Sequence, residues 1–90
     1  MSQKASAEFL VSNQLGLHVR AAAMVVRTMT PFTCKVSIQA GGSVADARSV
    51  LDLLTLSASK GTRIVVEAEG DDADAAVATL GDLIARNFAE

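Results

Sequence analysis

The residues of this chain best suited to group transfer lie in the segment Gly16-Leu17-His18-Val19-Arg20, which contains its one histidine. Gly16 gives the backbone conformational freedom, and the alanines that follow Arg20 favour a helix. A histidine at the start of a helix lies beside unpaired backbone N–H groups and the positive end of the helix dipole. Arg20 adds a planar guanidinium that suits phosphate oxygens. The spacing therefore predicts a site that forms and holds a phosphohistidine.

A neutral imidazole nitrogen is an available nucleophile at pH 7, so His18 could accept a phosphoryl group and hand it on. Such transfers depend mainly on positioning and charge stabilisation, which helix N–H groups and Arg20 would supply. The alternative is that His18 only caps a helix or packs in a polar corner. Arg20 would then be an ordinary solvated residue.

Length and composition indicate one small domain, residues 1–90, with a core from about residue 6 to residue 88. Half of the residues are hydrophobic, so a core is available without disulfides or metals. A single cysteine, Cys34, has no partner for a disulfide, which fits a reducing cytoplasm. One cysteine and one histidine do not make the common zinc sites. We therefore expect a cytoplasmic protein that binds no metal and no cofactor.

Two further patterns restrict the partners. Residues 1–66 carry seven Lys and Arg against three Asp and Glu, a net charge of +4, whereas residues 67–90 carry one against seven, a net charge of −6. This is either an ordinary solvated surface or a mildly basic face near His18 that meets acidic proteins. The acidic C-terminal segment and the absence of Trp and Tyr disfavour nucleic-acid binding. No signal peptide is recognisable, and the longest apolar run, Ala21–Val26, is too short to insert in a membrane.

The hydrophobic pattern switches between periods of 2.0 and 3.6, which predicts alternating strands and helices. Strands are expected at 8–12, 34–40, 43–46 and 63–68, and a Gly41-Gly42 turn makes the middle two a hairpin. Helices are expected from residue 19 to about 30, where Pro31 stops the first, from 49 to about 57, and after Asp72. The apolar stripes expected on the three helices are Val19, Ala22, Ala23 and Val26; Val50, Leu53 and Leu54; and Ala73, Val77, Leu80, Ile84 and Phe88.

The resulting order, β-α-β-β-α-β-α, predicts an α+β open-faced β-sandwich. Each strand has one apolar face, so the four-stranded sheet should be mostly antiparallel. Three helices should cover one face of the sheet, and water the other.

Three segments of the chain together resemble the HPr family, the histidine-containing phosphocarriers of the bacterial phosphoenolpyruvate-dependent sugar phosphotransferase system. They are Asn13 to Arg20, Asp46 to Leu56, and Lys60-Gly61-Thr62 followed by a strand and Glu69-Gly70-Asp71-Asp72. Each segment alone is a weak signal, but the three in this order and spacing are specific. The resemblance runs from about Glu8 to Phe88 and implies an HPr-like fold.

The resemblance also implies that the chain is a stoichiometric phosphoryl carrier and not an enzyme. His18 would accept a phosphoryl group on Nδ1 from enzyme I, which takes it from phosphoenolpyruvate, and would pass it to IIA domains of sugar permeases. Arg20 would stabilise the phosphorylated state. Ser49 would be a regulatory phosphorylation site in bacteria that have an HPr kinase/phosphorylase. A monomer is expected.

Ser49 has a structural interpretation as well, because Ser49-Val50-Leu51-Asp52 is a helix N-cap pattern of the capping-box type. Phosphorylation at a helix N-terminus is compatible with that role. The short helix that follows cannot bury all its leucines, so part of it should form a docking surface beside His18. The docking residues we expect are Arg27, Arg48, Val50, Leu51 and Leu54.

The chain departs from the family pattern near the site. Ala21 stands where a proline often follows the arginine, and Leu15 stands where some members place an Asn or Ser that orients the histidine ring. Thr30 and Asp52 stand where lysine is common in enteric members. One alternative is therefore a relative regulated through Ser49 in a nitrogen-related or catabolite-control pathway. Another is a small-molecule-binding regulatory domain with a βαββαβ core.

Overall fold

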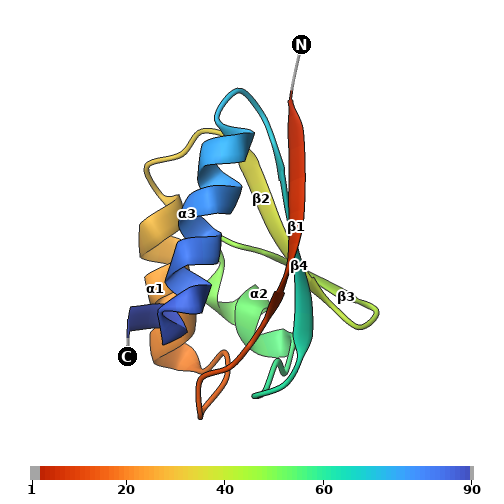
Figure 1. Cartoon of the computed structure of the whole chain (residues 1–90), viewed down its shortest axis with the longest axis vertical. Helices are drawn as coiled ribbons and strands as arrows, with labels where there is room; N and C mark the ends of the chain where they lie inside the picture. Colours follow the sequence, from red (N-terminus) through yellow and green to blue (C-terminus); the bar gives the residue numbers. More distant parts are fainter. Residues whose placement is uncertain (1–2, 90) are drawn as a thin grey trace.

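The structure, a computed structural model, describes residues 3–89 (Figure 1). This part of the chain contains four strands, three α-helices and a short 3₁₀ turn. The strands are β1 (Lys4–Leu10), β2 (Lys35–Ala40), β3 (Ser43–Asp46) and β4 (Arg63–Glu69). The helices are α1 (Val19–Met29), α2 (Val50–Thr55) and α3 (Ala73–Ala85), and the 3₁₀ turn is η1 (Asn87–Ala89).

The four strands form one sheet in the order β1-β4-β2-β3, and every neighbouring pair is antiparallel. Strand β4 is central: it pairs with β1 along its whole length and with β2 on its other side. Gly41 and Gly42 connect β2 to β3 as predicted, and Gly41 has φ +60, as a tight hairpin turn requires. Figure 1 shows the helices gathered on one side of the sheet, so the predicted open-faced sandwich is confirmed.

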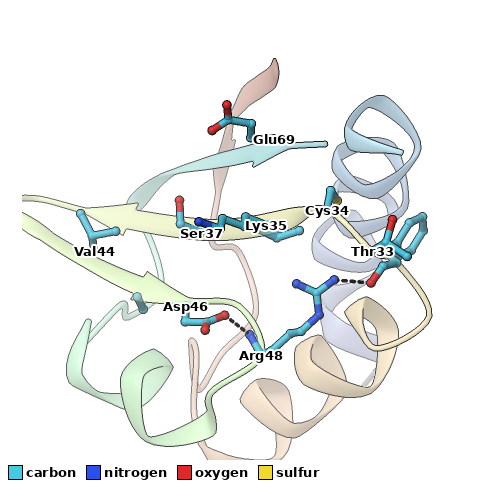
Figure 2. A pocket seen from close by; sticks show the side chains of 11 residues that line it. Thr33, Cys34, Lys35, Ser37, Val44, Asp46, Arg48 and Glu69 are labelled. Atoms are coloured by element: carbon cyan, nitrogen blue, oxygen red, sulfur yellow. Dashed lines mark hydrogen bonds between the residues drawn. The ribbon is translucent and has the colours of Figure 1, made fainter. Parts of the chain in front are cut away.

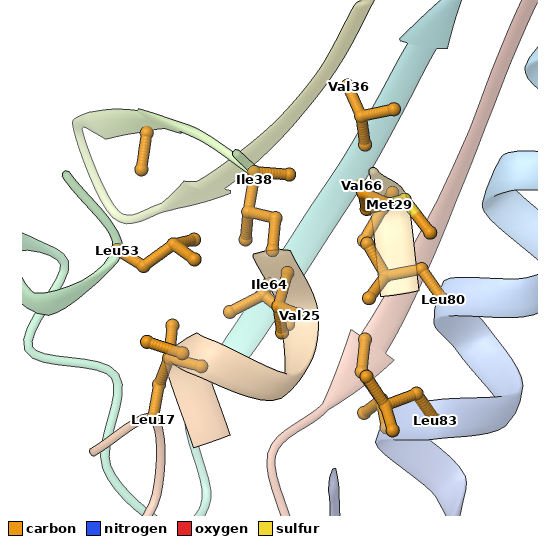
Figure 3. Close-up of a cluster of buried hydrophobic side chains, with 14 of the residues drawn as sticks. Leu17, Val25, Met29, Val36, Ile38, Leu53, Ile64, Val66, Leu80 and Leu83 are labelled. Carbon is orange, nitrogen blue, oxygen red and sulfur yellow. The ribbon is translucent and has the colours of Figure 1, made fainter. Parts of the chain in front are cut away.

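The core lies between the sheet and the helices. The predicted inward residues of β2 and β4 are buried, and side chains from α1, α2 and α3 meet them in one cluster (Figure 3). Because burying one large aliphatic side chain contributes about 1.5–3 kcal/mol, this cluster is the main source of stability. Its largest fully buried members are Phe88, Met29, Ile38, Leu53, Ile64, Leu80, Leu83, Val11, Val25 and Val66.

Two predictions about the first half of the chain are wrong in detail. Strand β1 begins at Lys4 and not at Glu8. The sequence pattern did not predict its first half because Ala5 and Ala7 are weak strand formers, and these residues are held in the sheet by pairing with β4. The apolar stripe of α1 is also displaced. Val19 is 62% exposed and Ala23 is exposed. Of the predicted stripe, Ala22 is buried and Val26 packs partly buried against the core, and the helix also buries Ala21, Val25 and Met29.

The phase of α1 was ambiguous for a physical reason. Residues 21–26 are all apolar, so several faces of the helix match an apolar stripe equally well. Contacts with α2 and α3 select the face that is buried.

The last helix ends earlier than predicted. Helix α3 stops at Ala85, and Phe88 reaches the core by a left-handed turn in which Asn87, Phe88 and Ala89 have φ between +56 and +63. The Oγ of Ser12 donates a hydrogen bond to Oδ1 of Asn87 at 3.0 Å. Phe88 is thus buried, as predicted, but not as part of the helical stripe.

Asp72 joins the α1–β2 loop to the start of α3. Its carboxylate accepts hydrogen bonds from the backbone N–H groups of Thr33 at 2.8 Å and Cys34 at 2.9 Å, and from the Thr33 hydroxyl at 3.3 Å. These bonds, the Thr33 N–H above all, lower the pKa of Asp72 to about 2. Burial raises the pKa of the Cys34 thiol, and the neighbouring Asp72 carboxylate raises it further.

Candidate functional site

His18 is the N-cap residue of α1. Its backbone is extended, with φ −85 and ψ −179, and its Nδ1 accepts a hydrogen bond from the backbone N–H of Arg20 at 3.2 Å. An imidazole nitrogen that accepts cannot carry a proton, so the neutral ring carries its proton on Nε2. The half-buried ring therefore directs the Nδ1 lone pair at the helix N-terminus.

The loop before His18 is tied to the segment after α2. The Leu17 N–H donates to the Ala58 carbonyl at 2.8 Å, and Val11 exchanges two backbone hydrogen bonds with residues 61–62 at 2.7 and 2.9 Å. Gly16 has φ +65, and a Cβ at this position would lie 2.4 Å from the Ala58 oxygen. Glycine is thus required both for its conformation and for this close approach.

The two arginines of α1 lie on its exposed side. Arg20 is in the first turn, and its own N–H is the donor to His18. Arg27 is seven residues further on, so it lies on the same side of the helix about 10 Å along the axis. Both side chains are exposed. The structure thus places the backbone N–H of Arg20 beside His18 and Arg27 two turns away.

Arg48 does not lie beside His18. Its Nη2 donates to the carbonyl oxygens of Met29 at 3.0 Å and Phe32 at 2.6 Å, so the half-buried guanidinium binds the C-terminal end of α1. The N-terminal end, with His18, is about 16 Å away along the helix. The expectation that Arg48 lies in a patch beside His18 is therefore not met, because its side chain is held by the carbonyl groups of Met29 and Phe32 at the other end of the helix.

Ser49 caps α2, as predicted. Its Oγ accepts a hydrogen bond from the Asp52 N–H at 3.2 Å. The reciprocal half of the capping box is absent from this pair, because the Asp52 carboxylate accepts from the Asp46 N–H at 3.2 Å instead. A phosphate on Ser49 would therefore lie near two carboxylates, those of Asp46 and Asp52.

The predicted docking residues of α2 differ in exposure. Leu51 is 78% exposed, whereas Val50 and Leu54 are half-buried and pack against the core. Two further hydrophobic residues were missed: Leu15 is 69% exposed and Val19 is 62% exposed. Both lie within three residues of His18 in the sequence, and that proximity was the available signal. Large exposed aliphatic side chains thus lie in the loop before α1, in the first turn of α1 and on α2, a helix that contacts α1.

A groove of about 720 Å³ lies elsewhere, between the start of β2 and the end of β3 (Figure 2). Cys34, Lys35, Asp46, Arg48 and Glu69 contribute to its lining, and His18 and Arg20 do not. Figure 2 shows the Arg48 guanidinium directed at the chain near Thr33, where it bonds to the backbone. The volume of the groove is therefore unrelated to the chemistry expected at His18.

Within residues 3–89, no cluster of three or more His, Cys, Asp or Glu is arranged to hold a metal ion. In the same range, no helix has the length and apolar character needed to cross a membrane.

Comparisons with known proteins point to one family. Residues 5–86 match the family model described as "PTS HPr component phosphorylation site". The chain is 37% identical over 83 residues to the phosphocarrier protein HPr of Xylella fastidiosa, and this match covers 92% of this chain and 93% of that protein. It is 36% identical over 88 residues to the multiphosphoryl transfer protein of Salmonella typhimurium, covering 94% of this chain and 23% of that larger protein.

A solved structure agrees with these sequence matches. The crystal structure of HPr-C-His from Thermoanaerobacter tengcongensis superimposes with a TM-score of 0.91 at 31% identity, covering 96% of this chain and 97% of that chain. The match thus extends over almost the whole fold, including the loop that carries His18. This chain therefore belongs to the HPr family, the phosphocarrier proteins of the phosphotransferase system.

Proposed function

We propose that this protein carries a phosphoryl group on Nδ1 of His18, accepts it from enzyme I and delivers it to IIA domains of sugar permeases. The observation that supports this most directly is the hydrogen bond from the Arg20 N–H to Nδ1, which places that nitrogen at the N-terminus of α1. Backbone N–H groups at a helix N-terminus bind phosphate oxygens and stabilise their charge.

The transfer step follows from this geometry. The hydrogen bond to Nδ1 opens, and the Nδ1 lone pair attacks the phosphorus atom of the donor. The Nδ1–P bond forms as the bond from phosphorus to the donor group breaks, and the ring keeps its proton on Nε2. The Arg20 N–H then donates to a phosphoryl oxygen, and the Arg20 guanidinium balances part of the new negative charge.

In this role the protein is a carrier and not an enzyme, because it is itself phosphorylated and dephosphorylated once in each transfer. Donor and acceptor proteins must both bind near His18, one after the other. The exposed side chains of Leu15, Val19 and Leu51 supply an apolar surface for such transient docking, and Arg20 and Arg27 add positive charge beside it.

Phosphorylation by enzyme I tests the proposal. The protein is incubated with phosphoenolpyruvate and a catalytic amount of enzyme I, and its intact mass is measured. The matched variant is His18→Asn, because asparagine also caps helices but is not a phosphoryl acceptor. We expect the mass of one phosphoryl group on the wild type, lost in acid and on addition of a IIA domain, and none on the variant. A folded wild type that gains nothing, or a variant that gains as much, would contradict the proposal.

A second candidate function is regulation through Ser49. Its Oγ lies at the start of α2, which contacts α1, so a phosphate there would add charge to the proposed docking region. The test is incubation with an HPr kinase/phosphorylase and ATP. An acid-stable phosphoryl group on the wild type, absent from Ser49→Ala, would support this role, and no incorporation would contradict it. Because this reaction does not involve His18, the two tests are independent.

A further inference from the structure

We propose that Asn13 positions His18 for phosphorylation by holding the carbonyl group of Gly16, an inference that rests on His18 being the phosphoryl acceptor. Within residues 3–89, Asn13 is the one amide, hydroxyl or charged side chain that is buried, with 3% of it exposed. Its Nδ2 donates to the Gly16 carbonyl oxygen at 2.8 Å. The Gly16 N–H donates in return to the Asn13 carbonyl at 3.2 Å. These two bonds close a four-residue turn.

The turn controls the position of the His18 main chain. The Gly16 carbonyl oxygen accepts the backbone N–H of His18 at 3.0 Å as well as the Asn13 amide. The Asn13 side chain and the His18 main chain therefore meet at one oxygen atom. The Leu17 N–H, which belongs to the same peptide group as the Gly16 carbonyl, donates to the Ala58 carbonyl at 2.8 Å. A movement of this peptide group would therefore disturb the path of the chain into α1.

The burial of Asn13 indicates that its donor is needed. Burying an amide is unfavourable unless its hydrogen bonds are made, and a leucine would fill a similar volume without that cost. Packing alone does not require an N–H donor at this position, whereas a fixed Gly16 carbonyl does. Leu15, inside the same turn, is 69% exposed and has no side-chain donor, so positioning falls to Asn13.

Asn13→Leu removes the donor and keeps the volume. We expect phosphorylation of His18 by enzyme I to slow about tenfold or more, because small displacements of a reacting group have effects of this size. The ¹⁵N chemical shifts of the His18 ring should also change, because a displaced ring weakens the bond from Arg20 to Nδ1 and redistributes the ring proton. A residue that only stabilised the fold would lower the unfolding temperature and leave these shifts unchanged.

The matched control is Ser12→Ala, which removes the 3.0 Å hydrogen bond to Asn87 from the same loop but leaves the Gly16 carbonyl untouched. It should keep the wild-type rate and ring shifts. Where Asn13→Leu does not fold, Asn13→Ser replaces it, since its short hydroxyl side chain perturbs the core less. We expect Asn13→Ser to be slower than the wild type and to shift the ring signals in the same direction.

The outcomes separate this inference from the proposed function. If the folded Asn13 variants match the wild type in rate and in ring shifts, the inference is wrong and the phosphocarrier role stands. If enzyme I does not phosphorylate even the wild type, the proposed function fails. In that case unchanged ring shifts would overturn the positioning role of Asn13, and changed ones would support it.

Discussion

At the scale of single residues, the loop before α1 contains the proposed phosphoryl acceptor, His18, and depends on Gly16 for its path. The Arg20 N–H bonds to Nδ1 of His18, which assigns the ring proton to Nε2 and leaves Nδ1 with the lone pair that the proposed transfer requires. Gly16 lets the chain approach Ala58 so closely that no other residue fits without a shift. The orientation of the His18 ring and the path of the backbone thus depend on adjacent parts of one loop.

The guanidinium of Arg20 is predicted to prolong the life of the phosphohistidine. Arg20→Lys keeps the charge but loses the planar pair of donors. We expect the phosphorylated variant to hydrolyse severalfold faster, which ³¹P NMR over time would measure. Because Arg20 is exposed, the free energy of unfolding should change by no more than about 0.5 kcal/mol. Arg27→Lys, on the same side of α1 but two turns away, is the control, and equal half-lives for both variants would refute the assignment.

A side chain at Gly16 is predicted to destabilise the protein more than the same change at Gly41. Both glycines have positive φ, +65 and +60, but a Cβ at Gly16 meets Ala58 at 2.4 Å and one at Gly41 meets nothing within 4 Å. Gly41→Ala should cost about 1 kcal/mol, the cost of the left-handed conformation. Gly16→Ala should cost about 3 kcal/mol or more, because backbone must also move. Urea unfolding measures both, and equal losses would show that the close approach is unimportant.

At the scale of elements, local patterns predicted some structures well and others poorly. The alternation of Val36 with polar neighbours in β2, and the cap at Ser49, are signals contained within a few residues, and both predictions are confirmed. The phase of α1 and the first half of β1 depend on distant partners, because alanines and apolar runs carry little directional information. The packed structure likewise determines which groups a long side chain such as that of Arg48 contacts.

The same reasoning applies to the proposed site. The helix start at His18 was predictable from glycine, histidine and arginine at fixed spacing, and the structure confirms it. The burial of the Asn13 amide could not be predicted, because an asparagine in a loop is usually exposed. Its role depends on a carbonyl three residues away whose direction follows from contacts with the segment around Ala58.

Arg48 is predicted to stabilise α1 without affecting phosphorylation. Removing its guanidinium leaves the carbonyl groups of Met29 and Phe32 without these donors, and Arg48→Ala should lower the free energy of unfolding by about 1–3 kcal/mol. The rate at which enzyme I phosphorylates His18 should stay unchanged, because the guanidinium is at the far end of the helix. Chemical denaturation and the phosphorylation assay check the two parts. A slower rate with unchanged stability would favour a docking role instead.

The carboxylate of Asp72 is predicted to make stability sensitive to acid. Its pKa is lowered to about 2 in the folded protein, so the stabilisation is complete above pH about 4 and is lost as the pH falls towards 2. Asp72→Asn should be less stable at neutral pH and should lose part of this acid dependence. Thermal unfolding from pH 2 to pH 7 provides the measurement. The exposed neighbour Asp71, mutated to Asn, should retain the wild-type dependence, and an identical loss there would contradict the assignment.

At the scale of the whole molecule, the two ends of the long axis differ in charge. Figure 1 shows the loop into α1 at the opposite end of the long axis from the turn between β4 and α3. The acidic residues 67–74 lie around that turn, whereas His18 and Arg20 lie at the start of α1. An acidic partner is therefore repelled from one end and attracted to the other. This charge asymmetry would favour docking of the proposed partners at the end of the molecule that contains His18.

Substitutions of two leucines in α2 are predicted to have different effects, one on docking and the other on stability. Leu51 is 78% exposed and Leu53 is fully buried. Leu53→Ala should lower the free energy of unfolding by about 2–5 kcal/mol, through lost burial and the cavity left behind. Leu51→Ala should change it little but raise the KM of enzyme I for the protein. Denaturation and steady-state kinetics distinguish the two, and a KM unaffected by Leu51→Ala would exclude this residue from docking.

The pairing of β1 with β4 has a consequence for synthesis on the ribosome. Residues 4–10 pair with residues 63–69, and the loop before His18 is bonded to Ala58 and to residues 61–62. The first strand must therefore wait, unpaired, until most of the chain has emerged, because such distant contacts form late. The surroundings of His18 are therefore completed only after residues 58–69, at least forty positions later, have been added. If His18 is the phosphoryl acceptor, as proposed, a nascent chain without these later residues would be a poor competitor for the donor.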